Sequence, residues 1–98
     1  MKYKISVECE YDGDNMVEDS FDDVSIINSI KKELEDGNTW AWCTVKVTLV
    51  FNDFELSEYL GGCSYDDKED FIKNSGYYED MVNNLKQTVI DAAKSLTI

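Results

Sequence analysis

The sequence predicts a two-layer α+β domain of order β-α-β-β-α, with a three-stranded, mostly antiparallel sheet and two helices packed on one face. Residues 3–11, 39–51 and 54–60 are predicted strands, because apolar side chains recur in them at strand spacing. Residues 21–36 and 77–95 carry apolar side chains at helical spacing. The 98 residues are enough for a single domain with one core, so residues 1–98 form one unit.

The first strand, residues 3–11, alternates cleanly between apolar and polar side chains. One face carries Tyr3, Ile5, Val7, Cys9 and Tyr11. Residues 12–20 are rich in Asp, Asn, Ser and Gly and are predicted as a loop.

The first helix is predicted over residues 21–36. Ser20 or Asp22 would cap its N-terminus, and Gly37 would end it. Its apolar stripe consists of Val24, Ile27, Ile30 and Leu34.

The central strand, residues 39–51, is the longest run rich in β-branched and aromatic residues. Alternation places Trp40 and Trp42 together on the face away from the helices. There they would anchor an interface, including one between two copies of the chain. Alternatively, Tyr65 and Phe71 of the following connection fold back and cover them.

A tight hairpin is predicted at Asn52 and Asp53, leading into the strand at residues 54–60. Glu58 falls on the apolar face of that strand, which a bulge or an early strand end would explain. Gly61 and Gly62 are expected to end it.

The last predicted helix covers residues 77–95 and follows a long connection at 61–76, which itself has a helical turn near 67–73. Ser75 is its candidate cap. Its apolar face consists of Tyr78, Met81, Val82, Leu85, Val89 and Ala92 or Ala93. If the first helix crosses over the sheet, the first two strands run in the same direction and the third strand lies between them.

The formal net charge is −12, and all nine basic residues are lysines. Direct binding of nucleic acid or of an anionic membrane needs a basic face, so this composition disfavours both. It favours a basic protein partner instead.

Acidic residues cluster in two segments, 8–23 and 53–70. Such arrays resemble spaced phosphates, so a DNA-mimic inhibitor of a host nucleic-acid-binding protein is the leading hypothesis. The alternative is a solubilising surface with helix caps and turns. The predicted acidic interaction face consists of Glu8, Glu10, Asp12, Asp14, Glu18, Asp19, Glu55, Glu58, Asp66, Asp67, Glu69 and Asp70.

The three cysteines, Cys9, Cys43 and Cys63, are expected to be buried thiols in a reducing compartment. A zinc site would lack a fourth ligand, since the chain has no His. Because the first ten residues are too charged for a signal peptide and no apolar run reaches about 18 residues, we expect a cytoplasmic protein.

Other ligands and catalysis have little support in the sequence. Asp12 and Asp14 open like a calcium-binding EF-hand loop, but Met16 and Val17 occupy places that need an oxygen ligand and a glycine. The chain has no His, no G-x-S-x-G motif and no phosphate-cradling glycine loop. We therefore expect no metal, no cofactor and no enzymatic activity.

The strings LEDGN, WAWC, YLGGCSY, EDF and GYYEDM stand at 34–38, 40–43, 59–65, 69–71 and 76–81. Together they resemble a family of small acidic uncharacterised proteins of bacteriophages and bacterial mobile elements, over about residues 22–85. The resemblance implies a protein that occupies a binding surface of host machinery, as anti-restriction and anti-CRISPR proteins do. It supplies no catalytic or binding residues.

Overall fold

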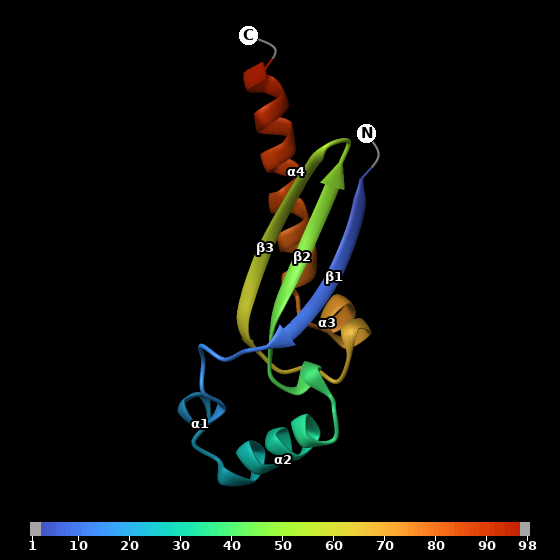
Figure 1. Ribbon diagram of the computed structural model, residues 1–98. Helices are drawn as coiled ribbons and strands as arrows, with labels where there is room; N and C mark the ends of the chain where they lie inside the picture. Colours follow the sequence, from blue (N-terminus) through green and yellow to red (C-terminus); the bar gives the residue numbers. More distant parts are fainter. Residues whose placement is uncertain (1–2, 97–98) are drawn as a thin grey trace.

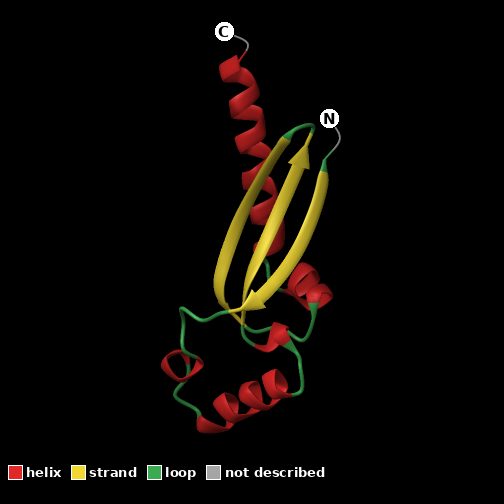
Figure 2. Cartoon of the chain, viewed as in Figure 1, coloured by secondary structure: helices red, strands yellow, loops and turns green. Residues whose placement is uncertain are grey.

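The computed structural model describes residues 3–96 and shows an α+β protein with a three-stranded antiparallel sheet (Figures 1 and 2). The element order is β-α-α-β-β-α-α and not β-α-β-β-α. The elements are β1 (Lys4–Tyr11), α1 (Val17–Ser20), α2 (Val24–Glu35), the 3-10 turn η1 (Thr39–Ala41), β2 (Cys43–Phe51), β3 (Phe54–Cys63), α3 (Lys68–Asn74) and α4 (Tyr77–Leu96). α3 lies where a helical turn was predicted near 67–73, whereas α1 lies in the predicted loop at 12–20.

The strand order is β1-β2-β3, and both neighbouring pairs are antiparallel. The predicted order, with the third strand in the middle, is wrong. The segment that holds α1 and α2 leaves and re-enters the sheet at the same end, so it makes no crossover (Figure 1). β2 therefore runs back beside β1 and becomes the central strand.

One face of the sheet packs against α4 and α3 and forms the main core. Val45, Val47 and Leu49 of β2 are fully buried there. Leu85 of α4 and Phe71 of α3 cover this face. Burial of apolar side chains on this scale is the dominant favourable contribution to folding.

The first predicted helix does not join that layer. The prediction that this helix and the last one pack on the same face of the sheet is therefore also wrong. α2 lies beyond the end of the sheet (Figure 2). Together with α1 and η1 it forms a second, smaller core, whose buried residues are Val17, Ile30, Ala41 and Trp42.

The helix that was predicted from residue 21 begins at Val24 instead. Asp23, not Ser20 or Asp22, caps it by accepting a hydrogen bond from the Ser25 N–H. The backbone of Phe21 stays extended, and its ring meets the Trp42 ring edge-on, with the ring centroids 6.1 Å apart. Val24 is therefore an exposed helix start and not part of the apolar stripe.

The hairpin at Asn52 and Asp53 is confirmed, and Asn52 adopts a left-handed φ of 53°. β3 does not end at the two glycines. A bulge at Gly61–Gly62 accommodates an extra residue between the pairs Val45–Leu60 and Cys43–Cys63. It lies after Glu58, and the register from Phe54 to Leu60 is regular, so neither a bulge nor an early strand end explains why Glu58 is on the apolar face.

The predicted strand 39–51 begins later, because residues 39–41 form η1 and β2 begins at Cys43. The end of α2 and the start of α4 agree with the sequence prediction. Gly37 ends α2 with a φ of 95°. Asp67 caps α3, and Ser75 accepts a hydrogen bond from the N–H of Tyr77 at the start of α4.

The molecule is a rod, with extents of 56 × 21 × 21 Å. α4 runs along the sheet, and its C-terminal end projects past the β2–β3 hairpin (Figure 1). Among residues 3–96, no helix combines the length and the apolar character needed to cross a membrane.

Candidate functional site

Negative charge is concentrated in one half of the rod. We call residues 12–42 and 64–80 the acidic half; they gather where β1 and β3 end (Figure 1). These segments contain fifteen carboxylates and four lysines, a formal charge of −11 out of −12. The rest of the chain, which we call the hairpin half, contains six carboxylates and five lysines and is nearly neutral.

Few of the carboxylates in the acidic half are neutralised by lysine. Within residues 3–96 the structure has two ion pairs, Lys31–Glu18 and Lys73–Glu69, and both are solvent-exposed. Exposed pairs of this kind add little stability. Several exposed carboxylates have no lysine partner in the described part of the chain: Asp14, Asp19, Asp22, Glu35, Asp36, Asp66, Glu79 and Asp80.

Other carboxylates of this half serve the local fold. The hydroxyl and N–H of Ser25 donate to Asp23 and lower its pKa. The backbone N–H of Asp66 donates to Asp70 and lowers the pKa of that carboxyl. Capping and turn stabilisation therefore account for some of the acidic residues, as the alternative hypothesis expects.

Asp12 is buried, with 2 % of its surface exposed, so placing it on an interaction face was wrong. Its carboxylate accepts hydrogen bonds from the N–H groups of Asp14 (3.0 Å), Asn15 (3.1 Å) and Gly62 (2.7 Å), and from the Asn15 amide (2.9 Å). Burial alone raises the pKa of this carboxyl, but the hydrogen bonds outweigh it and lower the pKa to about 2. Asp12 thus ties the loop after β1 to the bulge in β3.

The bulge leaves little room for side chains beside this carboxylate. A Cβ on Gly61 would lie 3.1 Å from Asn15 Nδ2 and 3.2 Å from Asp12 Oδ2, and Gly62 has a φ of +64°. Because N–H groups donate to both carboxylate oxygens of Asp12, these oxygens are poorly placed to bind calcium. No group of three or more candidate ligand residues within residues 3–96 could hold a metal ion.

Trp40 and Trp42 do not form the predicted interaction face. Trp40 lies in η1, which Asn38 caps, and its ring packs on Phe71 with centroids 6.1 Å apart. Trp42 is 2 % exposed, and its Nε1 donates to the Asn15 carbonyl at 2.8 Å. The 3-10 turn breaks the strand alternation, so the two indoles enter different cores.

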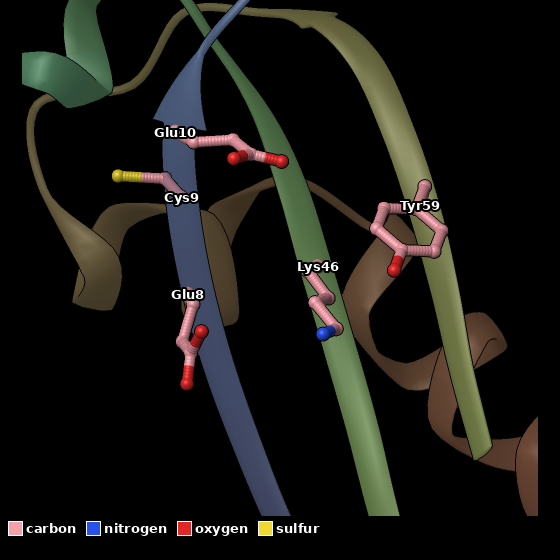
Figure 3. Close-up of a pocket in the computed structure, with 5 residues that line it drawn as sticks. All are labelled: Glu8, Cys9, Glu10, Lys46 and Tyr59. Atoms are coloured by element: carbon pink, nitrogen blue, oxygen red, sulfur yellow. The ribbon is translucent and has the colours of Figure 1, made fainter.

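The sheet face opposite α4 and α3 is open and carries three of the predicted glutamates, Glu8, Glu10 and Glu55. Glu8 pairs in register with Lys46 on β2, and the Lys46 ammonium lies 5.8 Å from the centre of the Tyr59 ring. Figure 3 shows Glu8, Glu10, Lys46 and Tyr59, which line a hollow of about 190 Å³ together with Cys9. This face mixes both signs of charge, and Glu10 lies near the end of β1 that leads into the acidic half.

Glu58 points to the other side of the sheet, in register with Val47. One of its carboxylate oxygens is buried without a hydrogen-bond partner within residues 3–96. The predicted acidic face is therefore divided. The members that lie exposed or half-buried in the acidic half are Asp14, Glu18, Asp19, Asp66, Asp67, Glu69 and Asp70.

The structure adds acidic residues that sequence reasoning left out or assigned to caps. Asp22 precedes α2, Glu35 and Asp36 lie at the C-terminal end of α2, and Glu79 and Asp80 lie in the first turn of α4. Acids at the C-terminal end of a helix oppose its dipole, and this was the signal in the sequence that Glu35 and Asp36 do not serve stability.

The cysteines are free thiols, and Cys43 and Cys63 are buried. Burial, reinforced by nearby Cys9 and Cys63, raises the pKa of Cys43 to about 12. Burial also raises the pKa of Cys9 and Cys63. A thiol with a raised pKa is a poor nucleophile and a poor metal ligand at neutral pH.

Comparisons with protein-family models, curated proteins and solved structures gave no match to this chain. The likeness to small acidic phage proteins therefore stays a prediction from the sequence strings.

Proposed function

We propose that the acidic half binds a basic surface of another protein and so blocks that surface from its own ligand. The concentration of −11 of the −12 formal charge in one half, with two exposed ion pairs among residues 3–96, supports this proposal. Concentrated negative potential accelerates encounter with a positive surface, and salt weakens that attraction.

The finer form of this proposal is mimicry of nucleic acid. The groove of a nucleic-acid-binding protein is positively charged because it must neutralise phosphates. The acidic half offers carboxylates without lysine partners, among them Asp14, Asp19 and Asp66. A host defence protein is the kind of partner that the resemblance to mobile-element proteins implies.

The test is capture of partners from host lysate by the immobilised full chain, at low and at high salt. Two triple variants have the same net charge. One neutralises the acidic half and consists of Asp14→Asn, Asp19→Asn and Asp66→Asn. The other neutralises the open sheet face and consists of Glu8→Gln, Glu10→Gln and Glu55→Gln.

Capture should be lost in the first variant, kept in the second, and weakened by salt for the wild type. Free duplex DNA should release a partner bound through mimicry. Capture that persists in both variants, or that does not respond to salt, would remove the proposal. Salt-sensitive capture that DNA does not reverse would leave a basic protein partner and remove the mimicry.

A further inference from the structure

A groove lies within the acidic half, where the segment between α1 and α2 comes beside the end of β3. It consists of two hollows, of about 310 Å³ and about 600 Å³, which both reach Phe21 and Ser64 and therefore adjoin. We call it the aromatic groove, because rings recur along it. Its exposed or half-buried lining includes Phe21, Ile26, Ser29, Ser64, Tyr65 and Tyr77.

The fold uses the aromatic rings of this groove only in part. The Phe21 ring meets Trp42, and the Tyr65 ring meets Phe71 with the ring centroids 5.2 Å apart, yet neither Phe21 nor Tyr65 is fully buried. Tyr77 is 53 % exposed and makes no ring contact within residues 3–96. Because aromatic rings gain much from burial, an exposed ring beside a hollow is a typical anchor point for a partner.

The charge around the groove selects a cation. None of the residues that line it is charged, but Asp22 and Asp66 follow two of its aromatic residues directly in the chain. Both are exposed and have no lysine partner in the described part of the chain. The lysine that follows the groove residues of α2, Lys31, is paired with Glu18. A cationic group would therefore meet aromatic surface inside the groove and negative charge beside it.

Arginine is the cation that suits this combination best. Its guanidinium is planar, weakly hydrated and packs on aromatic rings, whereas the lysine ammonium is compact and strongly hydrated. The hydroxyls of Ser29 and Ser64 make no hydrogen bond within residues 3–96, so they are free to accept guanidinium N–H groups. Arginine is also the residue that proteins favour for binding phosphate, so a nucleic-acid-binding surface carries it.

We propose that the basic partner of the acidic half lays an extended segment along the aromatic groove and inserts an arginine side chain beside Phe21, Tyr65 and Tyr77. This contact rests on the function proposed for the acidic half and adds the anchor to it. The carboxylates attract any basic surface, and the groove prefers arginine to lysine.

The test uses two peptides of equal charge, hexaarginine and hexalysine, titrated into the full chain at low salt by isothermal titration calorimetry. Cation–π contacts at exposed sites change affinity about two- to fivefold, so hexaarginine should bind the wild type more tightly than hexalysine by that factor. Tyr77→Ala should remove the preference for arginine, and Tyr77→Phe should keep it. The control Tyr59→Ala also removes an exposed tyrosine, but on the open sheet face, and should bind like the wild type.

A second pair of variants tests the groove without touching its rings. Ser29→Lys and Asn28→Lys each add one positive charge to an exposed position of α2, but only Ser29 lines the groove. Ser29→Lys should therefore weaken hexaarginine binding more than Asn28→Lys does. Far-UV circular dichroism establishes that each variant is folded.

Absence of hexaarginine binding, equal losses in the two lysine variants, or a preference for arginine that survives Tyr77→Ala would each overturn the groove contact. The triple variant that neutralises the acidic half separates this failure from failure of the proposed function. If that variant weakens hexaarginine binding and Tyr77→Ala does not, only the groove contact is removed.

Discussion

The two halves of the rod are held by different interactions. In the hairpin half, Val45, Val47 and Leu49 are fully buried under α4. Residues 64–80 of the acidic half share this core through Phe71. Residues 12–42 instead have a core of four buried residues around Trp42, and the buried Asp12 carboxylate fixes the loop that joins it to the sheet. The hairpin half therefore depends mainly on apolar burial, whereas residues 12–42 of the acidic half depend more on hydrogen bonds and on one indole.

This difference shows why the charge can be carried in one half. The like charges of the acidic half repel one another only weakly, because they are exposed, solvated groups that salt screens. The same difference also makes residues 12–42 the part of the fold most sensitive to mutation and to acid.

Trp42→Ala is the largest expected effect. It removes the centre of the small core and the hydrogen bond to the Asn15 carbonyl, and a buried Trp→Ala change costs about 3–5 kcal/mol. Hydrogen exchange should show lost protection over residues 17–36, while amides of β2 keep theirs. Leu49→Ala, in the main core, is the control and should lower protection throughout. If Trp42→Ala instead lowers hydrogen-exchange protection evenly across the chain, the two cores unfold together.

Acid should act next, through Asp12. Its pKa is lowered from 3.8 to about 2, so its contribution is complete above about pH 4 and is lost as the pH falls through 2. The shift corresponds to about 2 kcal/mol of unfolding free energy. Asp12→Asn should lose about that amount at pH 7 and show a flatter acid limb in urea denaturation at stepped pH.

The matched control for this prediction is Asp14→Asn. Asp14 is exposed and its carboxylate accepts no hydrogen bond within residues 3–96, so this variant should keep the wild-type acid limb. An acid limb that stays equally steep in Asp12→Asn would assign the sensitivity to other carboxylates, such as Asp23 and Asp70.

Strand and helix assignments could be predicted because alternation and helical spacing reflect which side chains are buried. Topology could not, because nothing in residues 12–42 distinguishes a helix that crosses the sheet from one that leaves and returns at one end. The late start of β2 had a local signal: Asn38 is a capping residue just before the turn at Thr39–Ala41.

The candidate site was predictable in composition and not in arrangement. Strand parity placed Glu8 and Glu10 correctly on the open face. It could not show that the carboxylates at 14–19 and 66–70 gather in one half of the molecule. The burial of Asp12 had a partial signal, since Asp-Gly-Asp-Asn at 12–15 favours turns in which the Asp side chain accepts backbone N–H groups.

The smallest effect distinguishes carboxylates kept for binding from carboxylates kept for stability. Glu35 is the last residue of α2, where a negative charge opposes the helix dipole, and Glu79 is in the first turn of α4, where it is favourable. At low salt, Glu35→Gln should raise the free energy of unfolding by about 0.3 kcal/mol, and Glu79→Gln should lower it by a similar amount.

Both changes remove one charge from the acidic half, so both should weaken capture of a basic partner to a similar extent. Urea denaturation measures the two changes in the free energy of unfolding, and capture from host lysate measures the loss of binding. If the two variants change stability in opposite directions but lose capture equally, these carboxylates are positioned for a partner. If Glu35→Gln stabilises the fold and leaves capture unchanged, Glu35 is not part of the contact, and the binding surface is confined to the rest of the acidic half.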